Sequence, residues 1–210
     1  DSAGRLWVGT NSGVAIHEST GWRILTQADG LLGDMVNVIL EDRIGGIWLG
    51  SYIAPRGGIS YLKNDIWQYY TIENGLPHNN ITSLIETSDG YLWAGCGLND
   101  RGGAVRFSFD GENWEIDRSL NKNDGLAGEK VRSLFEDLGI IWFGSEYDGL
   151  ALSDGHAWRT LTLEDGLSDL EIKAIKQDSD GNIWLGTRNG ITRINQNALK
   201  LLYDQFENIP

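Results

Sequence analysis

The nine tryptophans of this 210-residue chain recur in two alternating sequence contexts. Five of them open a Trp-x-Gly segment: Trp7, Trp48, Trp93, Trp142 and Trp184. The other four lie in a second apolar context: Trp22, Trp67, Trp114 and Trp158. Successive Trp-x-Gly segments start 41, 45, 49 and 42 residues apart, a period typical of propeller blades. The chain is therefore expected to be a repeat protein.

Each repeat reads as four short strands bounded by turn residues. A glycine and a second apolar strand follow the Trp-x-Gly strand, and then come the second tryptophan, an Asp/Asn-Gly-Leu turn and a fourth apolar strand. These fourth strands begin at Val36, Ile81, Val131 and Ile172. We name them strand a, and we name the Trp-x-Gly strand b and its two successors c and d, from innermost to outermost. Short β-rich segments with Asp-Gly and Gly-Gly turns predict antiparallel four-stranded blades and exclude a helical solenoid.

The strands divide the chain into about five blades. Residues 1–35 supply a partial blade, residues 36–79, 80–130 and 131–171 supply three complete blades, and residues 172–195 supply a second partial blade. Residues 196–210 lack the second tryptophan and are a degenerate strand d, an exit segment or a short helix. The expected fold class is all-β, a β-propeller that is either part of a longer array or a five-bladed ring closed by pairing across its ends.

Composition limits the possible partners. A formal net charge of -13 and the absence of a basic cluster disfavour nucleic acid and anionic lipid. The single cysteine, Cys96, excludes an internal disulfide and a multi-cysteine metal cage. No apolar run approaches the roughly 18 residues of a membrane helix, and no signal peptide is present, so export would require elements outside this segment. We expect no membrane contact by this segment and no cofactor.

The repeated motifs resemble the two-component regulator propeller repeat. The residues that carry the resemblance are GRLWVGT, GGIWLGS, GYLWAGC, GIIWFGS and GNIWLGT, together with the glycine that opens each strand c and the Asp/Asn-Gly-Leu turns, over residues 1–194. The resemblance implies the periplasmic or extracellular sensor region of a bacterial hybrid histidine kinase or related receptor. Members of that family carry more repeats and then an immunoglobulin-like domain, a membrane helix and a kinase. A signalling output is therefore implied only by the family resemblance.

The repeats differ most between strands b and d. The gap from the first tryptophan to the second is 15, 19, 21 and 16 residues, whereas the return gap is 26, 26, 28 and 26 residues. We expect this variation to be loop growth on one face, because the enlarged b–c segments 51–57 and 95–103 should emerge beside segment 77–80. An aromatic ring beside amide and guanidinium donors suits a polyhydroxylated ligand. The candidate ligand-binding residues are Tyr52, Arg56, His78, Asn99, Arg101 and Tyr147, although long loops are also tolerated without a function.

The second position of strand a is polar in every copy, between apolar neighbours. These residues are Asn37, Thr82, Arg132 and Lys173, and we expect them at the mouth of the central channel. Two cations there, in an acidic protein, could attract an acidic sugar or another anion. They could equally only hydrate the channel, and the sequence slightly favours hydration.

Other patterns are better explained by structure than by a site. The tryptophans could stack on sugars, but their strict recurrence indicates packing between blades, with the strand d set partly exposed near the rim. Asp29, Asn74, Asp124 and Asp165 could ligate calcium, but their place before Gly-Leu is typical of turns. The acidic stretch 178–182 is interpreted as a hairpin, and Cys96 as a small strand residue.

Three functional hypotheses remain. The first is a noncatalytic sensor domain that binds a carbohydrate or similar small molecule on its loop face. The second is a protein-interaction or self-assembly module. The third and weakest is a propeller lyase or hydrolase, because His17, His78 and His156 occupy unrelated repeat positions and no catalytic motif is present.

Overall fold

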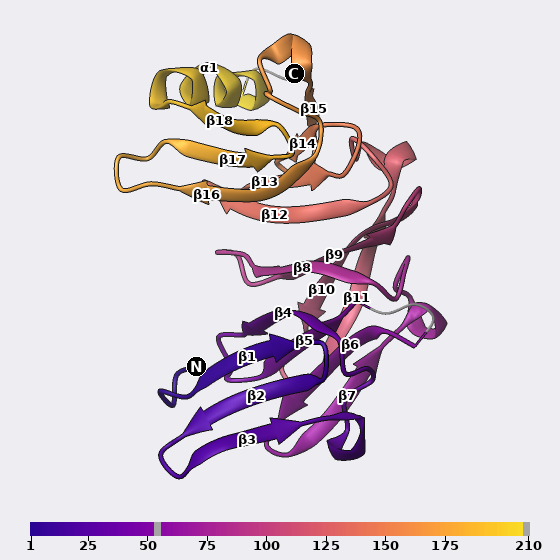
Figure 1. Ribbon diagram of the computed structural model, residues 1–210. Helices are drawn as coiled ribbons and strands as arrows, with labels where there is room; N and C mark the ends of the chain where they lie inside the picture. Colours follow the sequence, from indigo (N-terminus) through magenta and orange to yellow (C-terminus); the bar gives the residue numbers. More distant parts are fainter. Residues whose placement is uncertain (53–55, 208–210) are drawn as a thin grey trace.

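The structure, a computed structural model, describes residues 1–52 and 56–207. Their strands form five antiparallel sheets that are stacked in sequence order (Figure 1). Sheet 1 contains β1 (Leu6–Thr10), β2 (Gly13–Glu18) and β3 (Gly21–Leu25). Sheet 2 contains β4 (Val36–Glu41), β5 (Ile47–Ser51), β6 (Gly58–Lys63) and β7 (Ile66–Tyr70). Sheet 3 contains β8 (Ile81–Glu86), β9 (Leu92–Leu98), β10 (Arg101–Phe109) and β11 (Trp114–Leu120).

Sheet 4 contains β12 (Val131–Asp137), β13 (Ile140–Ser145), β14 (Leu150–Ser153) and β15 (Trp158–Leu161). Sheet 5 contains β16 (Ile172–Gln177), β17 (Ile183–Thr187) and β18 (Gly190–Ile194), and helix α1 (Gln196–Glu207) follows it. The β-propeller fold class, with three four-stranded and two three-stranded sheets, is confirmed. Of the three interpretations of the tail, the helix is the one observed.

The sheets form an open arc. Strands a, which are β4, β8, β12 and β16, lie side by side in that order along its inner side. Sheets 1 and 5 lie at opposite ends of the stack (Figure 1), and no described strand of one pairs with a strand of the other. The described residues therefore do not form the closed five-bladed ring that the sequence left open.

In the first four Trp-x-Gly strands the glycine lies directly against the first residue of the next strand a. A Cβ atom on Gly9 would lie 2.6 Å from the Val36 carbonyl oxygen, and one on Gly50 would lie 2.7 Å from Ile81 Cγ2. The same contact recurs between Gly95 and Val131 and between Gly144 and Ile172. In all four cases the partner is the first residue of the next strand a. The glycine is therefore required by packing between blades, because any side chain there would push the sheets apart.

The Trp-x-Gly tryptophans of sheets 2, 3 and 4 fill the space before the following sheet, whereas Trp7 of sheet 1 is half-buried. Trp48, Trp93 and Trp142 are buried, which confirms the packing interpretation for the interior repeats. Trp184 remains 38% exposed, because no described sheet follows sheet 5. Its indole nitrogen nevertheless donates to Asp178 Oδ2 at 2.7 Å, and Trp48 donates in the same way to Asp42.

The second tryptophan register contains one correction. Trp67 and Trp158 pack under the turn glycines of the preceding repeats, Gly30 and Gly125. In sheet 3 Ile116 takes that place against Gly75. Trp114 is instead buried deep against Trp48, with ring centroids 5.6 Å apart. Trp114 is thus not equivalent to the others, because the long β10–β11 hairpin places it further from the following turn.

The expected enlarged loop at 95–103 is also corrected. Residues 95–98 and 101–103 are paired strand, with Gly97 opposite Gly102 and Leu98 opposite Arg101. The turn consists of Asn99 and Asp100, and Asn99 adopts a φ of 55°, which Asn tolerates better than most residues. The growth of repeat three is therefore an extended hairpin at one end and a longer c–d hairpin at the other, and not loop growth on a single face. Segment 51–57 falls partly outside the described residues.

The Asp/Asn-Gly-Leu turns are explained by capping. In each turn, the side-chain oxygen of a Thr or Asn cap accepts a hydrogen bond from a backbone N–H of a short 3-10 turn. The backbone N–H of the cap in turn donates to the side chain of the Asp or Asn three residues later. The glycine that follows takes a positive φ, and the leucine after it is buried. The turn interpretation is confirmed for Asp29, Asn74, Asp124 and Asp165.

Candidate functional site

The polar residue of each strand a occupies a β-bulge. The ladder between strands a and b skips one residue in every copy, between Val36 and Val38 in β4 and at the equivalent points of β8, β12 and β16. The skipped residues are Asn37, Thr82, Arg132 and Lys173. A bulge redirects its side chain away from the regular alternation of the strand. Each of the four strands a therefore presents one polar side chain from an equivalent bulge.

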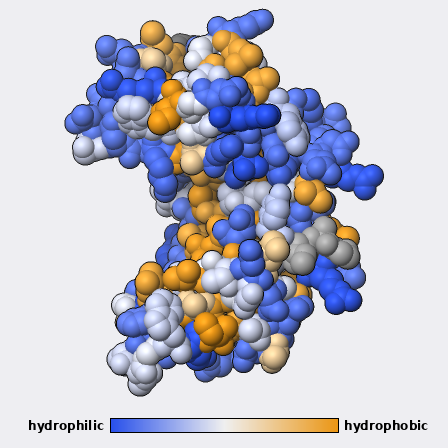
Figure 2. Space-filling model, viewed as in Figure 1, coloured by the Kyte–Doolittle hydropathy of each residue, from blue (hydrophilic) through white to orange (hydrophobic). Residues whose placement is uncertain are grey.

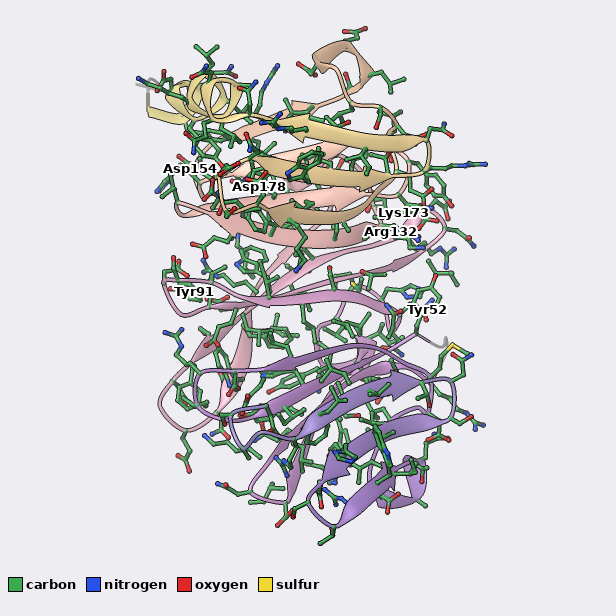
Figure 3. All side chains as sticks on the ribbon, turned by 60° about the vertical axis from the view of Figure 1, so that its left-hand side comes forward. Tyr52, Tyr91, Arg132, Asp154, Lys173 and Asp178 are labelled. Atoms are coloured by element: carbon green, nitrogen blue, oxygen red, sulfur yellow. The ribbon has the colours of Figure 1, made fainter. Side chains whose placement is uncertain are left out.

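All four bulge side chains line one cavity at the inner edge of the arc. The cavity has a volume of about 420 Å³, and its fifth lining residue is Tyr52. Figure 3 shows Tyr52, Arg132 and Lys173 along one edge of the stack, opposite the edge that carries Tyr91, Asp154 and Asp178. We name this the axial cavity. It joins the channel-mouth group with one residue of the loop-face group.

The charged side chains of the axial cavity form a chain of ion pairs across sheets 4 and 5. Arg132 Nη1 donates to Glu146 Oε2 at 3.1 Å, and Arg132 Nε lies 3.4 Å from Glu171 Oε1. Lys173 Nζ reaches the same Glu171 oxygen at 3.7 Å. Glu146 Oε2 also accepts from Lys130 Nζ. Three cations therefore share two carboxylates.

Tyr52 is held over this charged chain by Lys130, whose side chain is almost fully buried. The Lys130 ammonium donates to the Tyr52 hydroxyl at 3.3 Å and lies 5.6 Å from the centre of its ring. Burial opposes the ionisation of Glu146, but the hydrogen bond and charge of Lys130 and the charge of Arg132 outweigh it, so the pKa of Glu146 lies below its usual value. Through Lys130 the network ties Tyr52, the residue after β5, to the start of sheet 4.

The remaining loop-face candidates do not join the axial cavity. Arg56, Asn99 and Arg101 are exposed and line none of its wall. His78 Nδ1 accepts from the Asn80 backbone at 2.9 Å, and burial and the charges of Arg101 and Lys130 lower its pKa. Tyr147 lines a neighbouring cavity of about 330 Å³ together with Glu146 and Glu171. The charge of Glu146 raises the pKa of Tyr147.

The repeats of the chain match a known family model. The model described as "Two component regulator propeller" matches residues 75–97 and 166–189, and each match runs from a turn glycine through a Trp-x-Gly strand. Two of the five repeats of this chain thus match the two-component regulator propeller model. A comparison with curated proteins gave no match to the chain.

Solved structures share the fold of these repeats. The extracellular domain of the hybrid two-component system BT3049 of B. thetaiotaomicron superposes with a TM-score of 0.81 at 22% identity, over 100% of this chain and 28% of that one. The corresponding domain of BT4673 gives a TM-score of 0.68 at 20% identity, over 90% and 25%. Virginiamycin B lyase from Staphylococcus aureus gives 0.68 at 16% identity, over 94% and 65%. The chain thus spans about a quarter of the length of the two-component domains.

Lys130, Glu146 and Glu171 are the members of the ion-pair network that the sequence analysis missed. Lys130 and Glu171 immediately precede a strand a, and Glu146 immediately follows a strand b. Aligning the residues just outside each strand, and not only within it, would have found them. Their role depends on neighbouring sheets, so spacing alone does not pair them.

The propeller repeats show little catalytic machinery among the described residues. Within residues 1–52 and 56–207, no group of three or more His, Cys, Asp or Glu could hold a metal ion. Cys96 is fully buried, and burial raises the pKa of its thiol to about 12. None of the described helices is long and apolar enough to cross a membrane.

Proposed function

We propose that this chain is a noncatalytic sensor module that binds a carbohydrate or a related polyhydroxylated molecule in the axial cavity. The observation that carries the proposal is the convergence of four bulge side chains and Tyr52 on one polar cavity. An aromatic ring surrounded by an amide, a hydroxyl and two cationic groups offers an apolar face and hydrogen-bonding partners for a sugar. The structural likeness to extracellular domains of two-component systems supports a sensing role outside the cytoplasm.

A lyase or hydrolase function has less support. The distant likeness to virginiamycin B lyase is one of fold, at 16% identity. The axial positions where metal-dependent propellers would need histidines or carboxylates carry Asn37, Thr82, Arg132 and Lys173. An amide, a hydroxyl and two cations are poor ligands for a divalent metal but good hydrogen-bonding groups for a polar ligand.

Isothermal titration against a panel of neutral and acidic oligosaccharides tests the proposal. Tyr52→Ala removes the aromatic wall and should weaken binding about tenfold, the loss of about 1.4 kcal/mol. Tyr69→Ala is the matched control, because Tyr69 is partly exposed on β7 and bonds Gly30 away from the cavity. Absence of binding by the folded chain for every sugar, or equal losses in both variants, would count against the axial cavity.

A second candidate is self-assembly through the two open ends of the arc. Leu6 and Val8 of sheet 1 and Ile191 of sheet 5 are exposed, as is part of Trp184. Figure 2 shows hydrophobic atoms reaching the surface over sheet 1. Sedimentation velocity of Ile191→Glu tests this function. A dimer lost in Ile191→Glu and retained in Tyr52→Ala would favour assembly over ligand binding, whereas a monomer at all concentrations would exclude it.

A further inference from the structure

The axial cavity carries an excess of positive charge in a strongly acidic chain. Among residues 1–52 and 56–207, the carboxylates that pair with Lys130, Arg132 and Lys173 are Glu146 and Glu171, whereas the chain as a whole has a formal net charge of -13. A cluster with more cations than carboxylates creates a local positive potential on an otherwise acidic surface. The cavity is thus the place where this protein would accept an anionic group.

The excess charge is concentrated on Lys173. Lys130 is buried against Glu146 and Tyr52, and Arg132 divides its nitrogens between Glu146 and Glu171. Lys173 has one carboxylate contact, at 3.7 Å, to an oxygen that Arg132 also uses, and its side chain is 45% exposed. A distance of 3.7 Å is too long for a strong hydrogen bond. Lys173 is therefore the cation with most capacity for another partner.

We propose that the ligand of the axial cavity is an acidic saccharide whose anionic group binds Lys173 and Arg132. This inference rests on the proposed sensor function and names its ligand class. A carboxylate or sulfate would serve as the third anion for the three cations, forming charge-assisted hydrogen bonds. Asn37 and Tyr52 also line the cavity. The Asn37 amide nitrogen already donates to the Ile81 carbonyl at 3.3 Å, so Asn37 offers its Oδ1 and Tyr52 offers its hydroxyl proton to the sugar hydroxyls. Thr82 already donates its hydroxyl to the Val131 carbonyl, so towards a ligand it acts as an acceptor.

Because Glu171 competes with the ligand for Lys173 and Arg132, two substitutions should change the binding affinity in opposite directions. Lys173→Gln removes the least satisfied cation and should weaken binding of an acidic oligosaccharide about tenfold, the range of one charge-assisted hydrogen bond. Glu171→Gln replaces a competing carboxylate with a neutral amide of similar shape and should strengthen the same binding severalfold. A change that only disturbs the fold cannot raise affinity, so the second variant separates binding from stability.

The experiment is a calorimetric titration of the whole chain with an oligogalacturonate, its neutral galactose counterpart of the same length and a sulfated analogue. Lys176→Gln is the control, because Lys176 is exposed on the same strand β16 outside the cavity. We expect acidic sugars to bind at least about tenfold more tightly than neutral ones at low salt, with the preference shrinking as salt screens the charges. The uronate and sulfate arms identify which anionic group is preferred.

Each other outcome has a definite meaning. Equal binding of neutral and acidic sugars, weakened by Tyr52→Ala and unaffected by Lys173→Gln, would overturn the acidic ligand and leave the sensor function standing. No binding of any sugar would overturn both. Equal losses in Lys173→Gln and Lys176→Gln would place the anion elsewhere on the surface. Sodium sulfate that binds as tightly as the oligosaccharide would reduce the cavity to a general anion site.

Discussion

Gly50 and Gly186 occupy the same position in their Trp-x-Gly strands but face different surroundings, and alanine should separate them. A Cβ atom at Gly50 would lie 2.6 Å from Val38 Cγ1 and 2.7 Å from Ile81 Cγ2. At Gly186 the nearest atom is Ala174 Cβ at 3.7 Å, an ordinary contact. The difference has two causes. Within the sheet, Gly50 faces Val38 whereas Gly186 faces the smaller Ala174; between sheets, Ile81 of sheet 3 packs on sheet 2, whereas no described sheet packs on sheet 5.

The two substitutions should have opposite effects on the free energy of unfolding. Ile81 is fully buried, so Gly50→Ala must shift packed atoms, and overpacking of this kind costs about 1–3 kcal/mol. Gly186→Ala creates no clash and restricts the unfolded chain, an effect of about 0.4–1 kcal/mol in favour of folding. The two variants should therefore differ by about 2–3 kcal/mol, the sum of typical values of these two effects.

Urea denaturation followed by tryptophan fluorescence measures the difference. The midpoint should fall in Gly50→Ala and stay level or rise in Gly186→Ala, with similar slopes in both. Gly144→Ala repeats the test one interface further on, against Ile172. Equal destabilisation at Gly50 and Gly186 would refute the reasoning, because the cost would then come from the strand itself and not from the neighbouring sheet.

Three further predictions concern individual side chains. Hydrogen bonds from Trp184 and Asn182 lower the pKa of Asp178 to about 2. Its stabilising effect should therefore be complete above the unfolded pKa of about 3.9 and be lost as the pH falls towards 2, so Asp178→Asn should flatten the acid limb of thermal midpoint against pH. Because burial raises the pKa of Cys96 to about 12, Ellman's reagent at pH 8 should react only after denaturation, and rapid reaction of the folded chain would contradict that burial. Thr71 caps its 3-10 turn through a bond from the Glu73 amide at 3.2 Å, so Thr71→Ala should destabilise the chain by about 1 kcal/mol in urea denaturation, and an unchanged midpoint would show that the cap contributes little.

Much of the fold was predictable because its causes are local and repeated. The Trp-x-Gly strands, the capped Asp/Asn-Gly-Leu turns and the polar second position of strand a all recur in the sequence itself. Because each motif occurs several times, the assignment of its strands and turns does not depend on a single ambiguous copy. The expected equivalence of Trp114 with the other second tryptophans was wrong. Three strands of sheet 3, β9, β10 and β11, are longer than their counterparts, and a register change cannot be read from tryptophan spacing alone.

The candidate site was predictable only in part. The four channel-mouth residues come from the repeat pattern, but their meeting with Tyr52 over Lys130 joins residues 78 positions apart in the chain. Glu146 and Glu171 were missed because a carboxylate in a loop acquires its partner only when two sheets pack. The expectation that the four residues only hydrate the channel stays a prediction, and the proposed acidic ligand is the alternative that the shared ion pairs of Arg132 and Lys173 favour.

By itself, the sequence determined that this is a propeller, where its blades begin and which residues its turns require, because these follow from spacing, capping and backbone sterics within each repeat. Only the tertiary structure decided that the sheets form an open arc, that Trp184 stays partly exposed while Trp48 is buried, and that the bulges share one cavity. The physical reason is that the burial of a side chain and the pairing of its charge depend on which blade packs against it. Identical motifs therefore have different environments according to what packs against them.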